Sequence, residues 1–413
     1  MAQYKSELLN YLNERGYIYQ LTDLAALDEL LATKKIALYA GFDLTAGSLH
    51  IGSLLPIMVL RILQKFGHKP IILLGSATTK IGDPSGKDST RTMLNADDIK
   101  LNKQGIEKIF AHFLSAGNYE LVDNEEWIKE LNYVDFLREV GSKFSVNQML
   151  RYESVKQRLE REQNLSFLEF NYMILQAFDF AYLRKNNDCM LQIGGSDQWG
   201  NIVNGIELNR KLNPNLGEIY GLTTPLLVDN KGKKMGKTEK GAIWLDKDLL
   251  SAYDYFQFFR NITDDKLGEF LRFFTELDIN KIKELETLEG QELNQAKEIL
   301  AFEVTKICHG ELAAIKARDT ARQVFNQGLV GAELPVYELE KTTEISLSNI
   351  AVELGVMATG GEVKRIIKGG GGKIDGTKIT DPFLRINYSL FKGKEELKIS
   401  LGKKKHFMVK LKI

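Results

Sequence analysis

The sequence predicts an α/β protein in which a domain with a parallel β-sheet is followed by an α-helical domain and a small α+β module. Two strand-to-helix units, at residues 36–75 and near residues 190–199, predict the parallel sheet. A long helical stretch with few strand patterns predicts the second domain, and a glycine-rich, basic segment predicts the module. The chain therefore divides into residues 1–246, residues 247–330, a linker over 331–344, and residues 345–413.

The first strand-to-helix unit begins with the apolar run 36–40, which has the length and composition of a buried strand. A turn-rich connection over 41–47 follows it. Apolar side chains then recur at helical spacing over 51–66, and Gly67 ends this helix. The apolar run 70–75 is the next strand, so the unit has the β-α-β pattern of a parallel sheet.

The second unit has a strand over 190–193, a turn at Gly194 and Gly195, and a helix that begins near Trp199. Two such units imply a parallel sheet with helices on both faces, and ligands of such sheets bind at the carboxyl ends of the strands. Residues 165–184 predict a further helix. Three polar side chains follow one face of it at steps of four and three, namely Tyr172, Gln176 and Asp179.

Beyond residue 245 the sequence pattern changes twice. Residues 246–328 are helical and poor in strand patterns, and beyond the linker we expect helices over 348–354 and 362–368 and a short strand over 378–380. The whole chain has 55 basic and 55 acidic residues, but residues 345–413 hold 14 Lys or Arg and 6 Asp or Glu, a net charge of +8. A basic module on an acidic body suggests a polyanion partner; on charge alone, the alternative is a lysine-rich solubilising segment.

Bulk properties exclude several classes of protein. A chain of 413 residues with 44% hydrophobic residues is expected to form two or three globular domains. Its two cysteines, Cys189 and Cys308, lack the spacing of a metal site, so we expect neither a structural metal nor a disulfide framework. No apolar signal core begins the sequence and no run of about 18 apolar residues could span a membrane, so we expect a cytoplasmic protein.

Two short segments roughly 180 residues apart point to a triphosphate. His50, Ile51 and Gly52 open a helix just after a strand, where free amides and the helix dipole favour anions. A loop over 231–238 follows the run 226–228, which we predict as a strand, and it carries four lysines and two glycines. Together they suit attack at the α-phosphorus of ATP, where charge builds on the departing pyrophosphate. Each segment alone has a structural reading, as a helix cap and as a solvated surface loop.

Taken jointly, these segments resemble the signatures of a class I aminoacyl-tRNA synthetase, which are a His-Ile-Gly-His element and a later Lys-Met-Ser-Lys-Ser element. The sequence is most similar to the bacterial tyrosyl-tRNA synthetases of that family, through residues 38–43, 48–52, 81–86 and 191–201. The resemblance covers nearly the whole chain. It implies a Rossmann-like catalytic domain, a helical domain on the anticodon side of the tRNA, and a C-terminal RNA-binding module.

The resemblance also implies roles for individual residues. Those matched to tyrosine binding are Tyr39, Asp83, Tyr172, Gln176, Asp179 and Gln198. Those matched to catalysis at the phosphates are Thr45, His50, Lys87, Arg91, Lys234, Lys237 and Thr238. Those matched to ATP binding are Gly41, Asp43, His50, Gly52, Ser53, Gly195, Asp197 and Lys237. Two positions depart from the family pattern, because Ser53 replaces the second histidine and Gly236 replaces the serine of the second element.

The activity implied is that of a tyrosine–tRNA ligase, which forms tyrosyl-adenylate and pyrophosphate from tyrosine and ATP and then transfers tyrosine to the 3′ end of tRNA(Tyr). The substrate carboxylate is already ionised, so alignment and charge stabilisation suffice and no enzyme nucleophile is needed. We expect no tightly bound cofactor and no protein metal site, with Mg²⁺ arriving with ATP. The expected partners are tRNA and a second copy of the chain.

Three alternatives remain at this stage. The tryptophan enzyme of the same subclass shares the signatures, but Tyr39 with Asp179 favours a phenol. A non-ligase adenylyltransferase would share the first histidine element without needing the basic module. A catalytically inactive RNA-binding paralogue is disfavoured, because four residues of the family's site are intact, namely His50, Asp83, Asp179 and Lys237.

Overall fold

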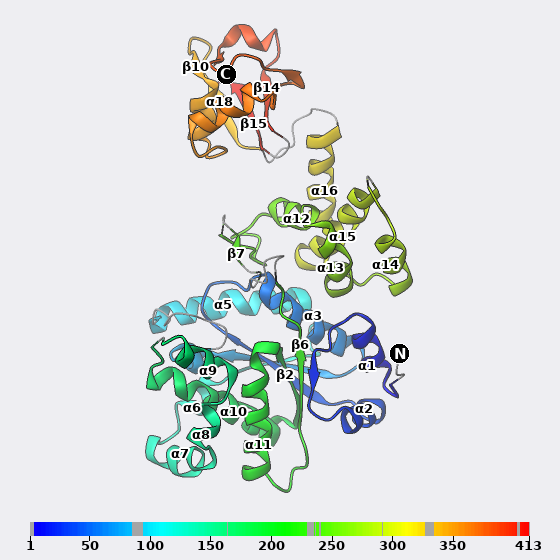
Figure 1. Cartoon of the computed structure of the whole chain (residues 1–413), viewed down its shortest axis with the longest axis vertical. Helices are drawn as coiled ribbons and strands as arrows, with labels where there is room; N and C mark the ends of the chain where they lie inside the picture. The colour runs from blue at the N-terminus through cyan, green and yellow to red at the C-terminus, as the bar shows by residue number, and fades with distance from the viewer. Residues whose placement is uncertain are drawn as a thin grey trace. The chain divides into compact units, whose positions relative to one another are not determined.

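The computed structural model describes residues 4–84, 94–162, 164–228, 241–290, 292–326, 334–402 and 405–412, together with residues 235, 237 and 238. The chain forms two compact units, residues 1–310 and residues 311–413, which are described separately below (Figure 1). The helical stretch up to residue 310 belongs to the same unit as the sheet, so the expected division near residue 246 does not coincide with a boundary between these units.

The first unit is built on a six-stranded sheet in the order β1-β6-β5-β2-β3-β4. Its strands are β1 (Gln20–Leu21), β2 (Ala37–Asp43), β3 (Lys69–Gly75), β4 (Glu120–Asp123), β5 (Cys189–Gly195) and β6 (Tyr220–Thr224). All neighbours pair in parallel except β1, which runs antiparallel to β6. The predicted parallel sheet is confirmed. From β2 the chain adds β3 and β4 on one side and later β5 and β6 on the other, so β2 and β5 flank the point where the strand order reverses.

Helices cover both faces of this sheet. Figure 1 shows α3 and α5 on one face and α10 and α11 on the other. The helices that precede the helical layer are α1 (Glu7–Glu14), α2 (Leu24–Thr33), α3 (Ile51–Lys65), α4 (Ser76–Thr79), α5 (Ala96–Phe113), α6 (Glu125–Ile128), α7 (Tyr133–Glu139), α8 (Val146–Met149), α9 (Glu153–Glu160), α10 (Phe167–Asn187) and α11 (Trp199–Leu212).

Local signals explain where the two helices nearest the site begin. His50 caps α3, and Ser166 and Glu169 form a reciprocal capping box at the start of α10. Both helices bury apolar faces, and an apolar cluster that includes Tyr39, Phe180 and Ile202 joins β2 to α10 and α11. Removal of this apolar surface from water, at about 25 cal/mol per Å², fixes the helices on the sheet.

One predicted strand lies elsewhere. The run 226–228 was expected as a strand, but the strand in this region is β6, which ends at Thr224. Pro225 follows directly, and proline cannot donate to a sheet ladder, so the ladder ends there. Beyond it, β7 (Lys237–Thr238) and β8 (Gly241–Ala242) form a short antiparallel pair.

The helical layer of the first unit comprises α12 (Ala252–Arg260), α13 (Leu267–Phe274), α14 (Ile279–Glu286) and α15 (Glu292–His309). The end of α13 is held from two directions. The buried Arg15, just after α1, donates to the carbonyl oxygens of Arg272, Thr275 and Leu277. From α3, Arg61 pairs with Glu276 at 2.5 Å. These contacts tie the end of α13 to α1 and to α3, and α3 in turn packs on the sheet.

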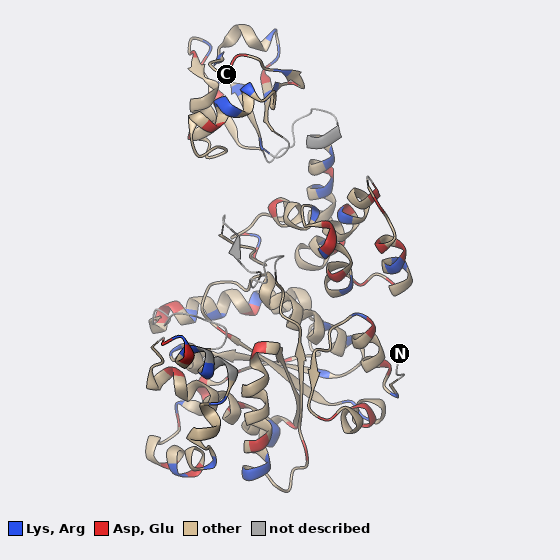
Figure 2. Ribbon diagram, viewed as in Figure 1, with Lys and Arg blue, Asp and Glu red and all other residues tan. Residues whose placement is uncertain are grey.

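The second unit contains α16 (Glu311–Asn326) and a small α+β module. The elements of the module are β9 (Val336–Leu339), β10 (Ile345–Ser346), α17 (Leu347–Glu353), α18 (Gly360–Lys368), β11 (Gly372–Ile374), β12 (Thr377–Lys378), β13 (Arg385–Ile386), β14 (Glu396–Leu401) and β15 (Lys405–Leu411). One sheet has the order β12-β11-β14-β15-β9, and β10 pairs with β13. Figure 2 shows where the basic residues of this module lie.

The expected linker over 331–344 contains an ordered strand. Residues 336–339 form β9, which pairs in parallel with β15 and buries Leu339 in the core of the module. Four residues are too short a run to reveal a strand whose partner lies about 70 residues away in sequence. The module therefore begins before residue 345.

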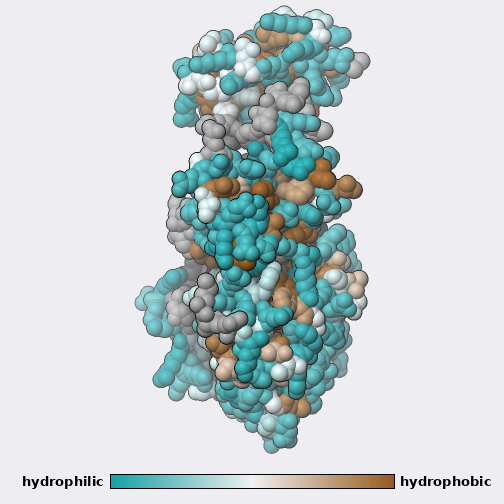
Figure 3. Space-filling view, turned by 90° about the vertical axis from the view of Figure 1, so that its right-hand side faces the viewer, coloured by the Kyte–Doolittle hydropathy of each residue, from teal (hydrophilic) through white to brown (hydrophobic). Residues whose placement is uncertain are grey.

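Among the described residues, no helix is long and apolar enough to cross a membrane. The face drawn in Figure 3 is largely hydrophilic, with separate apolar patches between the polar side chains.

Candidate active site

A cavity of about 880 Å³ opens at the carboxyl ends of β2 and β5, where the strand order reverses. This is the position at which open parallel sheets bind their ligands. Fourteen of the predicted site residues line it: Tyr39, Gly41, Asp43, Thr45, His50, Gly52, Ser53, Asp83, Tyr172, Gln176, Asp179, Gly195, Asp197 and Gln198. Lys87, Arg91 and Lys234 lie outside the described residues, and Lys237 and Thr238 are described only as the backbone of β7.

Asp179 and Tyr39 lie in the deepest part of the wall. The carboxylate of Asp179, which is 1% exposed, accepts hydrogen bonds from Trp127 Nε1 at 2.8 Å and from Asn124 Nδ2 at 3.0 Å. Tyr39 is fully buried, and within the described part of the chain its hydroxyl has no hydrogen-bond partner. A buried hydroxyl without a partner is costly, so this atom is suited to a ligand oxygen.

Burial raises the pKa of Asp179 to about 7, against the lowering effect of the Asn124 and Trp127 hydrogen bonds. The nearby carboxylates of Asp43 and Asp123 raise it further. Burial, together with the charge of Asp179, raises the pKa of Tyr39 well above its ordinary value. At neutral pH the cavity wall therefore offers an acceptor, a carboxylate near its titration point, and a donor, a neutral phenol.

Asp43, at the end of β2, gathers a second group of polar side chains. Its carboxylate accepts from the hydroxyl of Tyr172 at 3.2 Å and from Thr78 Oγ1 at 3.0 Å. Thr78 also accepts from Asn124 Nδ2 at 3.1 Å, so the chain of contacts continues to Asp179. The sequence grouped Asp43 with ATP and Tyr172 with tyrosine, but the structure brings these two side chains into direct contact.

A third polar group joins α10 to the turn after β5. Gln198 Nε2 donates to Asp83 at 2.8 Å, and Gln176 Nε2 donates to Gln198 Oε1 at 3.1 Å. Asn201 Nδ2 in turn donates to Gln176 Oε1 at 2.8 Å. Three of the residues predicted to bind the amino acid thus form one hydrogen-bonded chain with a carboxylate at its end. This arrangement can receive an ammonium group.

The N-terminus of α3 forms the opposite side of the cavity. His50 Nδ1 accepts from the Gly52 amide at 3.0 Å, so the proton of the neutral ring resides on Nε2 and can be donated. A Cβ atom on Gly52 would lie 3.3 Å from the carbonyl oxygen of Met235. The two signature segments therefore approach each other, and the His50 ring, whose Cε1 would lie 2.7 Å from the same Cβ atom, leaves no room for a larger residue. Ile51 also donates to the Ile243 carbonyl at 2.9 Å, beside Trp244 in the cavity wall.

At the end of β5, glycine leaves room beside two polar side chains. A Cβ atom on Gly195 would lie 2.7 Å from Asp197 Oδ1, and one on Gly194 would lie 2.9 Å from the Cβ of Gln198. The backbone is consequently bare where the cavity meets the turn. Such a surface can hold the flat part or the ribose of a nucleotide, with Asp197 as a hydroxyl acceptor.

Sequence reasoning missed four residues of this site. Asn124 and Trp127 hold Asp179, Thr78 holds Asp43, and Asn201 extends the Gln176 chain. Asn124 directly follows β4, so the rule that ligands gather at the carboxyl ends of strands could have found it. The position of Trp127 gives no such indication, because a tryptophan on a four-residue helix is equally consistent with a role in the hydrophobic core and with a role in the site.

A model of the family described as tRNA synthetases class I (W and Y) matches residues 31–326. The chain belongs to this family. Two relatives of this class I tRNA synthetase are named tyrosine–tRNA ligase. The one from Wolbachia sp. subsp. Brugia malayi is 52% identical over 98% of this chain and 99% of its own length. The one from Zymomonas mobilis is 51% identical over 99% of both chains.

A solved structure gives the same result for the fold of this class I tRNA synthetase. The C-terminally truncated mitochondrial tyrosyl-tRNA synthetase of Aspergillus nidulans aligns with a TM-score of 0.69 and 32% identity, over 77% of this chain and 94% of its own. The predicted α/β fold class and family are confirmed by these comparisons.

Proposed function

We propose that this class I tRNA synthetase is a tyrosine–tRNA ligase. The observation that carries the proposal is that one cavity holds both an acceptor on Asp179 and a buried hydroxyl on Tyr39, for which the described residues provide no partner. A phenol O–H donates one hydrogen bond and accepts another, so it satisfies both groups. The indole N–H of tryptophan only donates and would leave the Tyr39 hydroxyl unpaired. The ring of phenylalanine offers neither contact.

The amino-acid backbone would lie between the two other polar groups. The carboxylate of Asp83, held by Gln198, and the oxygens of Tyr172 and Gln176 would receive the α-ammonium group. Gln198 would contact the substrate carboxylate. One carboxylate oxygen of tyrosine forms the bond to the α-phosphorus of ATP, and the bond from that phosphorus to the bridging oxygen breaks, which releases pyrophosphate. A terminal ribose hydroxyl of tRNA then attacks the acyl carbon and releases AMP.

ATP would occupy the side of the cavity formed by α3 and the end of β5. The amides of Gly52 and Ser53 already donate to His50, so the phosphate oxygens would be bound by the positive end of the α3 dipole at Gly52, the hydroxyl of Ser53 and the Nε2–H of His50, with Thr45 on the preceding turn. Gly41, Asp43, Gly195 and Asp197 would contact the adenosine. Cations for the departing pyrophosphate would come from Lys87, Arg91, Lys234 and Lys237, with the hydroxyl of Thr238. Mg²⁺ would arrive as part of the ATP substrate, held mainly by its phosphates.

We propose tRNA as the polyanion for the basic module, with the helical region over 247–330 on the anticodon side. The excess of 14 basic over 6 acidic residues in 345–413 supports this assignment. Homodimer formation and a cytoplasmic location follow from the resemblance to bacterial enzymes of this family and belong to the same proposal.

Exchange of labelled pyrophosphate into ATP, measured with each of the twenty amino acids, tests the activation step. Tyrosine should support exchange and phenylalanine should support far less, because a site built for a hydroxyl rejects the analogue that lacks it. Exchange driven best by tryptophan would assign the chain to the other branch of the family. The absence of exchange with every amino acid would remove the proposed activity.

A further inference from the structure

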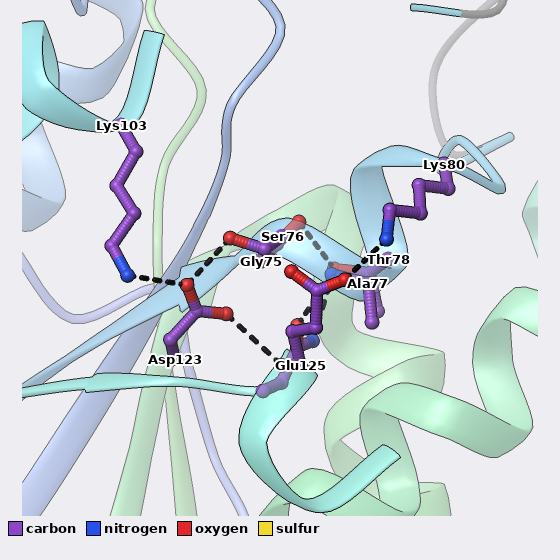
Figure 4. Close-up of polar contacts among 9 residues, drawn as sticks. Gly75, Ser76, Ala77, Thr78, Lys80, Lys103, Asp123 and Glu125 are labelled. Atoms are coloured by element: carbon purple, nitrogen blue, oxygen red, sulfur yellow. Dashed lines mark hydrogen bonds and ion pairs between the residues drawn. The ribbon is translucent and has the colours of Figure 1, made fainter. Parts of the chain in front are cut away.

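The turn that presents Asn124 to Asp179 is itself held by a polar cluster outside the cavity. We call Ser76, Lys103 and Asp123, together with the Asp123–Glu125 turn, the Asp123 cluster (Figure 4). None of its members lines the cavity described above. The cluster brings together the start of α4, the middle of α5 and the end of β4, three elements that meet behind the pocket wall.

Asp123 is the centre of this cluster. It is 5% exposed, and its Oδ2 accepts from Ser76 Oγ at 2.6 Å and from Lys103 Nζ at 2.7 Å. Its Oδ1 accepts from the Glu125 amide at 3.0 Å. Lys103 is the partner that supplies the opposite charge. Burial alone would lower the pKa of Lys103, but the hydrogen bond and charge of Asp123 raise it above its ordinary value.

The next residue, Asn124, transmits this geometry to the cavity. Its backbone amide donates to the Leu74 carbonyl at 3.1 Å, and its side-chain oxygen accepts from the Ala77 amide at 2.9 Å. With Oδ1 committed to Ala77, the Nδ2 group must point the other way, toward Asp179 at 3.0 Å. The turn therefore fixes which end of the amide faces the carboxylate.

The ion pair between Asp123 and Lys103 affects the ionisation of Asp179, because other carboxylates lie nearby. The groups facing Asp179 are Tyr39 and Asp43 on β2 and Asp123 at the end of β4, and both carboxylates disfavour a negative charge on Asp179. Lys103 offsets one of them. Without this lysine, Asp123 would be a buried carboxylate with no ionic partner among the described residues, a state that costs several kcal/mol and drives protonation or movement of the turn.

We propose that Lys103 is a positioning residue for recognition of the substrate phenol, because through Asp123 it holds the turn that orients Asn124 and Asp179. The proposal rests on the proposed function and extends it to a side chain that touches no substrate. If the role of Lys103 were purely structural, its loss would weaken the fold and reduce activity equally with every substrate. If Lys103 positions Asn124 and Asp179, its loss reduces activity with tyrosine in particular, because only tyrosine has the hydroxyl that binds Asp179.

The test is Lys103→Met, which keeps the length of the side chain and removes its charge. Lys80→Met is the matched control, since Lys80 pairs with the exposed Glu125 at the same turn (Figure 4). Pyrophosphate exchange would give kcat and KM for tyrosine and for phenylalanine at pH 6.5, 7.5 and 8.5. For Lys103→Met at pH 7.5 we expect KM for tyrosine to rise about threefold, because a rise of one unit from a pKa of about 7 lowers the ionised fraction of Asp179 about threefold at this pH, with kcat/KM for phenylalanine unchanged. The loss should shrink at pH 8.5.

Two further variants protect this test against simple unfolding. Lys103→Arg keeps the charge and should restore most of the preference for tyrosine. Lys103→Met combined with Asp123→Asn removes the unpaired carboxylate and should also recover tyrosine use at pH 7.5. Equal losses for both amino acids, or an unaltered tyrosine preference in Lys103→Met, would overturn the proposal. A wild-type enzyme that does not use tyrosine would instead overturn the proposed function.

Discussion

Replacement of Asp179 by asparagine separates the stability of this pocket from its activity. The pKa of Asp179 is raised from 3.8 to about 7, first by burial. A carboxyl group with a raised pKa in the folded state stabilises the fold fully below the unfolded pKa, and this contribution is lost as pH rises through the folded pKa. At about 1.4 kcal/mol per pKa unit, titration of Asp179 should lower the free energy of unfolding by about 2–3 kcal/mol between pH 5 and pH 8.

Asparagine does not titrate, so Asp179→Asn should not show this fall in the free energy of unfolding between pH 5 and pH 8. Its Oδ1 can accept from Trp127, but its amide would then meet the Nδ2 group of Asn124, and one hydrogen bond is lost at a cost of about 1 kcal/mol. We therefore expect the variant to be less stable than the wild type at pH 5. Between pH 5 and pH 8 the difference should move by about 2–3 kcal/mol in favour of the variant, while tyrosine activation falls at every pH.

Urea unfolding followed by tryptophan fluorescence measures this difference, because all three tryptophans lie in residues 1–310. The control is Asp97→Asn, an exposed aspartate in the first turn of α5. If the stability difference between wild type and Asp179→Asn is the same at pH 5 and pH 8, then Asp179 does not titrate in this range. The assignment of an acceptor near its titration point would then be wrong.

Two further outcomes follow from the same structure. Tyr39→Phe should leave the fold intact and reduce the preference for tyrosine over phenylalanine about three- to tenfold, the value of one neutral hydrogen bond; an unchanged kcat/KM ratio would mean that another group contacts the phenol. Removal of residues 334–413, which takes β9 away together with its partner β15, should spare tyrosine activation and abolish most tRNA charging at moderate salt. Full charging by this truncated enzyme would exclude the module from tRNA binding.

The parts of the fold that could be predicted were those with local periodicity. The run over 51–66 and the strands on either side of it repeat at the spacing of one helix and two buried strands, and the structure places them there. The helical face of Tyr172, Gln176 and Asp179 also lines the cavity as its spacing suggested. In each case the structure of the element is determined by residues within that element, at short separations in sequence.

The parts that could not be predicted depend on contacts distant in sequence. Asn124 and Trp127 reach Asp179 across 55 and 52 residues, and neither side chain belongs to a signature. Strand β9 exists because it pairs with β15, so its four residues carry little information by themselves. The lysines at 87 and 234 lie outside the described residues, and their roles at the phosphates stay predictions.

The choice of neutral donors around Asp179 has a functional consequence. A lysine or arginine in place of Asn124 would pair with the carboxylate and remove the cost of burying it, but its several donors would also compete for the remaining lone pairs. Asn124 and Trp127 each supply one donor to one oxygen, which leaves lone pairs on both oxygens for a ligand. The raised pKa of Asp179 is therefore a cost of keeping an acceptor available to the substrate hydroxyl. Since Lys103 neutralises Asp123, the residue before Asn124, and within the described part of the chain forms no hydrogen bond with Asp179 itself, its positive charge limits that cost without occupying the site.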